Sequence, residues 1–217
     1  MANDRGRPRR PETDAAILRA TLDLLRDGGY RALSIEKVAT RAGVTRPTVY
    51  RRWPDKASLV VDALADAVPV APAPDTGDTR TDLHHLARGL VDRLTGLAPV
   101  ILGVLADSIG RDDLAAPLRD RYLRPRLATI TDVVDRGIVR GDLPSDTSPA
   151  TARDLLAGPL VYRWLVDGTL TDTDVHELVD TAWKALTAGA ALPSTPETEA
   201  VDAPPGDARR TRRGDAR

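Results

Sequence analysis

The chain has 217 residues, 41% hydrophobic and 29% charged, which is typical of a globular protein with a core and excludes a disordered chain. It contains no cysteine, which excludes disulfides and thiolate metal sites, and no apolar run of about 18 residues that would predict a membrane span. Residues 1–56 carry 13 Lys and Arg against 7 Asp and Glu, whereas residues 57–193 carry 13 against 20. This asymmetry indicates that only the first part contacts a polyanion.

Nearly every long segment has the apolar periodicity of a helix, and no stretch alternates as a strand does. The sequence therefore predicts an all-α fold with a short N-terminal helical domain and a C-terminal helical bundle. We expect residues 1–10 to form a flexible basic arm. We expect a first helix over 13–27, capped by Thr13 and ended by Gly28 and Gly29, and a second over 34–41, capped by Ser34.

A further helix is predicted over 55–68, followed by a Pro-rich break over 69–78. The helices expected beyond the break span 79–95, 98–109, 112–123, 125–140, 149–167 and 173–189. From residue 193 the chain is polar and Pro-rich, so the sequence predicts a disordered tail over 193–217. The expected domains are then 11–56 and 57–192. The absence of cysteine and of an apolar leader segment favours a cytoplasmic protein.

Residues 34–56, SIEKVATRAGVTRPTVYRRWPDK, have the pattern of a helix-turn-helix. Gly43 permits a tight turn between two short helices, and Thr45 is a suitable N-cap for the second one. Val49 and Trp53 lie four residues apart, so they share a face that we expect to pack inward. The opposite face then carries Arg46, Pro47, Thr48, Tyr50 and Arg51.

This outward face suits the major groove of DNA. Arginine pairs with guanine in a bidentate manner, and hydroxyl groups and helix N-termini hold phosphates. The alternative is an ordinary helical hairpin with a solvated basic face. Turn chemistry by itself favours neither interpretation, and the concentration of Arg, Thr and Tyr on one face favours DNA binding.

Residues 13–59 resemble the N-terminal DNA-binding domain of the TetR family of bacterial transcriptional regulators. The resemblance rests on the block AGVTRPTVYRRWPDK followed by Leu59, and on LLRDGGYRALSIEKVA before it. Trp53 stands where that family more often has Phe. The rest of the chain is similar to the family only in its helical layout.

The resemblance implies a homodimeric regulator that binds a palindromic double-stranded DNA operator and is released by a small-molecule effector. Carried over by position, it implies DNA contacts from Ser34, Thr45, Arg46, Pro47, Thr48, Tyr50, Arg51 and Lys56. The Gly-Arg-Pro segment of the arm adds Arg7 and Arg9, which suit a narrow minor groove. The same fold can also act as an activator, because sequence does not set the sign of regulation.

We expect apolar and aromatic side chains of the body to line an effector pocket, although for each one taken singly a plain core position is the better interpretation. The candidates are Leu102, Leu105, Ile109, Leu118, Tyr122, Ile130, Leu156, Tyr162 and Trp164. The last two helices have wide apolar faces that the resemblance assigns to a dimer interface. The candidates there are Leu160, Trp164, Val175, Val179 and Leu186.

Other classes of function are weaker. The sequence shows no nucleophile–base pair, metal triad or phosphate loop, so we expect neither an enzyme nor a cofactor. His84 and His85 are neighbours on a helix and point about 100° apart, which does not suit a shared metal ion. A helical ligand-binding or dimerisation protein that does not bind DNA is the remaining alternative.

Overall fold

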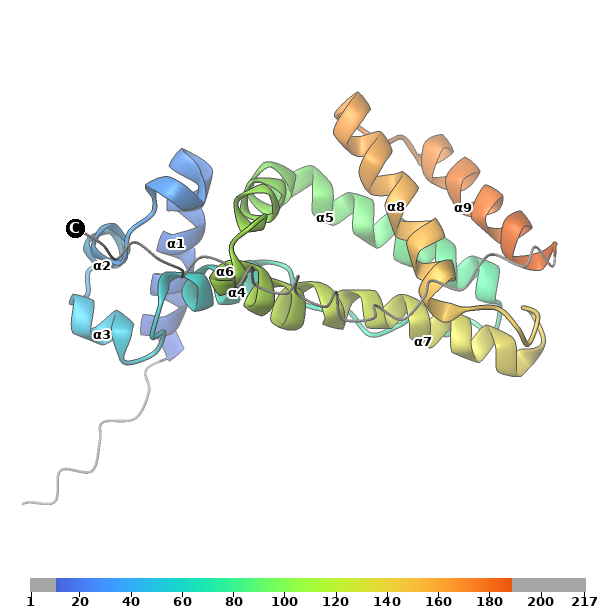
Figure 1. Ribbon diagram of the computed structural model, residues 1–217, viewed down its shortest axis with the longest axis horizontal. Coiled ribbons are helices and arrows are strands. Elements are labelled where there is room, and N and C mark those ends of the chain that lie inside the picture. Colours follow the sequence, from blue (N-terminus) through green and yellow to red (C-terminus); the bar gives the residue numbers. More distant parts are fainter. Residues whose placement is uncertain (1–10, 189–217) are drawn as a thin grey trace, which may run out of the picture.

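The computed structural model describes residues 11–188, apart from the side chains of residues 94 and 95. Within this range all regular secondary structure is helical (Figure 1). The basic arm, with Arg7 and Arg9, and the tail over 193–217 lie outside the described residues. The predicted all-α fold is confirmed.

Three helices form the N-terminal end of the described chain: α1 (Pro11–Ala32), α2 (Ile35–Ala42) and α3 (Arg46–Tyr50). Their apolar faces meet at Ile17, Val38 and Val49, which are completely buried. The predicted second helix is confirmed, and the Ser34 hydroxyl caps it by accepting a hydrogen bond from the Lys37 amide at 3.3 Å.

The first helix is longer than the sequence predicted. It begins at Pro11, so Thr13 lies inside it, and it is kinked rather than ended at Gly29, which has φ 70° and ψ −176°. The kink requires a positive φ, which glycine adopts without a Cβ clash. One further turn after the kink places Tyr30 in the core, where 1% of it is exposed.

After α3 the chain forms further helices of 6 to 30 residues. They are α4 (Lys56–Ala67), α5 (Thr79–Ser108), α6 (Asp112–Pro117), the π-helix η1 (Leu118–Leu123), α7 (Arg124–Arg140), α8 (Pro149–Asp167) and α9 (Asp172–Thr187). Figure 1 shows α4 and α6 between the N-terminal helices and the body formed by α5, α7, α8 and α9. Thr171 and Asp174 form a capping box at the start of α9.

Two segments differ from the helices expected in the body. The predicted helices 79–95 and 98–109 are joined as α5, whose parts Thr79–Arg93 and Gly96–Ser108 meet at 83°. The predicted helix 112–123 is divided into α6 and η1, and Pro125 fits the first turn of α7 without breaking it. Within the described residues, no single helix is long and apolar enough to cross a membrane, and the bent pair in α5 meets that test only by length and composition.

The buried side chains form two clusters that do not coincide with the expected boundary at residue 56. The first cluster joins α1–α4 to Leu97, Val100, Ile101 and Val104 of α5 and continues into α6 and η1. The second joins the first half of α5 to α7, α8 and α9. The N-terminal helices are therefore packed directly onto the second half of α5, so α5 belongs to both clusters.

Gly137 on α7 allows close packing against the start of α5, and its replacement by Ala tests that contact. An added Cβ would lie 2.6 Å from Oγ1 of the buried Thr79, whose hydroxyl donates to Asp142 at 2.7 Å. We expect Gly137→Ala to lower the free energy of unfolding by about 1–3 kcal/mol through overpacking, measured by urea denaturation.

Gly103→Ala on α5 is the matched control, because no heavy atom lies within 4 Å of the position that the added methyl group would take. There the methyl group should leave stability unchanged or raise it by about 0.5–1 kcal/mol. Equal denaturation midpoints for Gly137→Ala and the unmodified protein would contradict the packing described.

Candidate functional site

The turn between α2 and α3 has the geometry expected of a helix-turn-helix. Gly43 adopts the left-handed conformation, with φ 67° and ψ 31°. The Val44 amide donates to the carbonyl of Ala39 at 2.9 Å, which ends α2, and the Val44 side chain packs against the first cluster. α3 therefore leaves the turn in a direction determined by one glycine and one apolar anchor.

Side chains on the inner side of α3 and in the turn after it bind to α1 and α4. Val49 and Trp53 are buried as predicted, and the indole Nε1 of Trp53 donates to Asp62 on α4 at 2.9 Å. Arg52 pairs with Asp14 on α1 and also donates to the Thr48 carbonyl at 3.1 Å. These contacts hold α3 in one orientation.

The sequence analysis missed Arg52, Asp14 and Asp62. Arg52 lies three residues after Val49 and one before Trp53, so it shares the inward side of α3. A guanidinium in such a position requires a carboxylate or carbonyl partner, because an unpaired buried charge is costly. The position of Arg52 relative to Val49 and Trp53 could have predicted that it faces inward. Its partner Asp14 could not be predicted in this way, because it lies far away in sequence.

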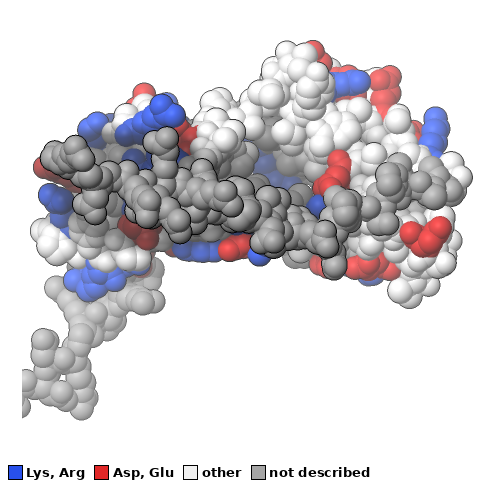
Figure 2. All heavy atoms as spheres, viewed as in Figure 1, with Lys and Arg blue, Asp and Glu red and all other residues white. Residues whose placement is uncertain are grey.

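The outer side of α3 is the outward face: Arg46, Pro47 and Arg51 are exposed and Tyr50 is 45% exposed. Thr48, the fifth residue assigned to this face, is half-buried. Thr45 occupies the N-cap position but makes no side-chain cap hydrogen bond, contrary to prediction, because its hydroxyl lies 3.0 Å from that of Thr48. Figure 2 shows Lys and Arg side chains gathered at this end of the molecule.

Lys56 has structural partners that the sequence did not indicate. Its ammonium donates to the carbonyls of Tyr30 at 2.8 Å and Leu33 at 3.0 Å, and it lies 4.1 Å from the centre of the Tyr30 ring. Burial lowers the pKa of Lys56, and the nearby Arg111 lowers it further. Two of its three N–H donors are thus occupied, which leaves one for the predicted phosphate contact.

A cavity of about 160 Å³ lies in the body between α5, η1, α7 and α8. Five predicted ligand-binding residues line it: Leu102, Leu105, Tyr122, Ile130 and Leu156.

Four of the nine ligand-binding candidates do not line the cavity. Leu118 is buried in the first cluster, away from the cavity lining. Ile109 and Tyr162 are 81% and 70% exposed, because Ile109 follows the end of α5 and Tyr162 lies on the outer side of α8. Trp164, which was also considered for the pocket, does not line it.

Two arginines that the sequence analysis did not single out, Arg93 and Arg126, also line the cavity. Burial lowers the pKa of both, and the positive charge of Arg93 lowers that of Arg126 further. Arg126 lies 3.8 Å from the centre of the Tyr122 ring. Burial likewise raises the pKa of the Tyr122 phenol. Both arginines lie in helices whose amphipathic pattern gave no sign that they face inward.

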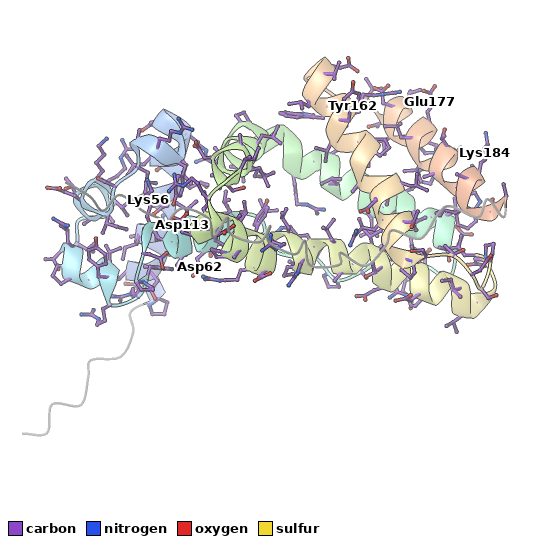
Figure 3. The ribbon with its side chains drawn as sticks, in the orientation of Figure 1. Lys56, Asp62, Asp113, Tyr162, Glu177 and Lys184 are labelled. Atoms are coloured by element: carbon purple, nitrogen blue, oxygen red, sulfur yellow. The ribbon has the colours of Figure 1, made fainter. Side chains whose placement is uncertain are left out.

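The predicted dimer-interface residues need a correction. Leu160, Val175, Val179 and Leu186 are buried inside one subunit, where α8 and α9 pack on α5 and α7, so their side chains do not reach the surface. Trp164 is half-buried. The exposed large apolar side chains of α8 are instead Tyr162, Leu165 and Val166, and Figure 3 shows Tyr162 at the same end of the α8–α9 pair as Glu177.

His84 and His176 join α5 to α9 and were not expected to meet. Their ring centroids are 4.3 Å apart, and Nε2 of His84 lies 3.1 Å from the Asp180 carboxylate. Burial lowers the pKa of His84, which favours a neutral ring. Among the described residues no three His, Cys, Asp or Glu side chains are placed to hold a metal ion.

Comparison with known proteins identifies relatives along most of the chain. Residues 17–63 match the family described as bacterial regulatory proteins, tetR family, and residues 73–182 match the tetracyclin repressor-like C-terminal domain. The chain is 34% identical to the HTH-type transcriptional regulator YdeS of Bacillus subtilis, over 89% of this chain and 100% of that one. It is 31% identical to the DNA-binding transcriptional repressor TetR of Mycobacteroides abscessus, over 76% and 89% of the two chains.

Solved structures give the same result. The crystal structure of the TetR family transcription regulator SCO0332 superimposes with a TM-score of 0.62 and 27% sequence identity. The superposition covers 83% of this chain and 100% of that one. The similarity therefore extends through the body as well as the helix-turn-helix.

Arg51 and Arg52 follow α3 directly, and replacing each of them distinguishes a surface role from a role in folding. We expect Arg52→Ala to lower the free energy of unfolding by about 1–3 kcal/mol, because it leaves Asp14 without its partner in a part-buried site. Arg51→Ala removes an exposed side chain and should change stability by less than about 0.5 kcal/mol. Thermal unfolding followed by circular dichroism makes the comparison, and equal losses for both variants would contradict the assigned roles.

Proposed function

The chain belongs to the TetR family of bacterial regulatory proteins, and from this premise we propose that it is a repressor released from its operator by a small-molecule effector. It is a helix-turn-helix transcriptional regulator, as its relatives are. The observation that carries the proposal is the outward face of α3, which presents Arg46, Tyr50 and Arg51 on a helix fastened from behind.

We assign the DNA contacts to two groups of side chains. Arg46, Pro47 and Arg51 project from the outer side of α3 and suit base edges in the major groove. Ser34, Thr45, Thr48, Tyr50 and Lys56 suit phosphates, which position the protein on the duplex. A protein that acts on chromosomal DNA works in the cytoplasm of a bacterium, and we place this one there.

We propose a homodimer formed through the outer side of α8 and α9. Tyr162, Leu165 and Val166 are 70%, 62% and 63% exposed there, and such grouped apolar exposure is typical of an interface. A two-fold dimer would present two α3 helices to half-sites about 34–36 Å apart, which accounts for a palindromic operator.

We propose that effector binding in the cavity moves α4 and so changes the spacing of the two α3 helices. Two contacts support this route. Arg126, which lines the cavity, donates to the carbonyl of Val68, the residue that ends α4. Asp62 in the middle of α4 accepts from Arg121 on η1 and from Trp53. An effector acts in this way only if it binds the two dimer shapes with different affinity.

DNA binding is tested with fluorescently labelled DNA from upstream of the gene, titrated at several salt concentrations. We expect affinity to fall steeply with salt, and Arg46→Ala and Tyr50→Ala each to weaken binding about tenfold or more, because such contacts contribute about 1–3 kcal/mol. Arg119→Ala, an exposed arginine on η1, is the control and should leave affinity unchanged. Salt-independent binding, or full affinity in both α3 variants, would show that the outward face does not bind DNA.

The dimer interface is tested by placing a charge on the exposed apolar patch of α8. We expect Leu165→Glu with Val166→Glu to give a monomer in light scattering and to weaken operator binding, because the two half-sites are then bound independently. Val139→Glu on α7 is the control, since Val139 is 88% exposed and lies on another helix. If the α8 double variant remained a dimer, the proposed interface would be wrong.

A further inference from the structure

We infer that the effector is an organic anion with an apolar body, whose negative group lies between Arg93 and Arg126. This inference deepens the function proposed above and rests on it, because it names the chemical class of the ligand that fills the cavity. Three features of the cavity carry it: two guanidinium groups with no acidic residue in the lining, a buried donor without a hydrogen-bond partner among the described residues, and an apolar lining.

The charge of the cavity is positive and has no acidic partner in the lining. Arg93 and Arg126 are the charged residues among the described side chains that line it, and neither Asp nor Glu is among them. Arg93 is half-buried and makes no hydrogen bond or ion pair with another described residue. The neighbouring acid on α5, Asp92, is exposed and lies 3.6 Å from Arg88. Burial lowers the pKa of Arg93, and the negative charge of Asp92 opposes this from outside the cavity lining. Guanidinium groups stay charged even when buried, so the cavity attracts an anion.

Arg126 has spare donor capacity inside the protein. Its Nη1 donates to the Tyr122 carbonyl at 2.6 Å and its Nη2 to the Val68 carbonyl. Its Nε is buried without a hydrogen-bond partner among the described residues. A buried donor without an acceptor destabilises the protein, and a carboxylate oxygen is an acceptor that would satisfy it.

The remainder of the lining determines the body of the ligand. It is formed largely by aliphatic side chains, among them Leu86, Leu90, Leu102, Leu105, Ile130 and Leu156. Such a surface offers few partners to a sugar or a nucleotide, whose hydroxyl and amide groups would lose their hydrogen bonds to water. A cavity of about 160 Å³ is close to the size of engineered apolar cavities that bind benzene, so it accommodates one ring or a short alkyl chain.

The position of the anion also connects it to α4. A carboxylate that binds Nε and draws the guanidinium of Arg126 into the cavity also withdraws Nη2 from the Val68 carbonyl. Loss of that hydrogen bond frees the end of α4, so an anionic ligand has a physical means of acting on the DNA-binding end. A neutral ligand of the same shape would not attract the guanidinium of Arg126 and so would not act on α4 in this way.

The inference is tested by calorimetry and thermal unfolding of the full chain with three anions: octanoate, 4-propylbenzoate and benzoate. Each is paired with the corresponding alcohol, and octylammonium is the cationic probe. We expect at least one anion to bind and raise the melting temperature, with its alcohol bound about tenfold or more weakly and octylammonium not bound. Failure of all three anions at millimolar concentration, or equal binding of anion and alcohol, would overturn the inference.

Substitutions of single arginines test which positive charge binds the anion. We expect Arg93→Gln to weaken anion binding about tenfold and to leave binding of the matched alcohol unchanged. Arg88→Gln on the same helix is the control, because Arg88 is exposed, pairs with Asp92 and Asp172, and does not line the cavity. Arg126→Lys keeps a positive charge but loses two donors, so it should show intermediate affinity. Full anion affinity in folded Arg93→Gln would place the anion elsewhere and refute the assignment.

Operator binding measured in the same samples separates this inference from the proposed function. Ligand-free Arg93→Gln should bind DNA as the unmodified protein does, since Arg93 lies outside the helix-turn-helix. If anions bind but DNA is not released, the effector mechanism fails and the ligand class stands. If DNA is released by a neutral or cationic compound instead, the ligand class fails and the proposed function stands.

Discussion

The carboxylate of Asp62 joins the helix-turn-helix to the body of the protein. It lies in the middle of α4 and accepts hydrogen bonds from two sides, from the indole of Trp53 at 2.9 Å and from the guanidinium of Arg121 on η1. Figure 3 shows Asp62 and Lys56 where the N-terminal helices meet the body. The rest of α4 is mainly apolar and buried, so the helix has little freedom to move independently of either side. The orientation of α3 therefore depends on where the body holds α4.

The cavity lies where the two buried clusters meet. Ile101 and Tyr122 in its lining belong to the first cluster, and Ile130, Leu156 and Leu160 belong to the second. Well-packed cores respond to an inserted group by discrete displacement rather than by gradual compression. A ligand that separates the clusters would thus act on α5, which belongs to both, and on η1. The π-helical turn of η1 supplies Tyr122 to the cavity and Arg121 to Asp62, so one irregular segment contacts both the cavity and α4.

Arginine serves three different purposes in this chain, and its surroundings decide which. Arg46 and Arg51 on the outward face have no acidic partner among the described residues and remain available to a polyanion. Arg52, next in sequence, turns inward and fastens α3 to Asp14. Arg93 and Arg126 face an apolar cavity, where burial lowers the pKa of each guanidinium.

Sequence by itself determined the helical fold, the helix-turn-helix and its two faces. These depend on local physics: Gly43 permits the left-handed turn, Ser34 caps α2, and the spacing of Val49 and Trp53 places them on one side of a short helix. The family resemblance rested on the same stretch, the block AGVTRPTVYRRWPDK followed by Leu59.

Only the tertiary structure decided which side of each body helix is buried. α8 carries apolar residues around much of its circumference, so periodicity could not separate Leu160, which is buried in the core, from Leu165 and Val166, which are exposed. The partners of Arg52, Lys56, Arg93 and Arg126 lie on other helices or in a cavity that forms only when the helices pack. Such contacts depend on the relative placement of distant segments, and no local pattern in the sequence specifies that placement.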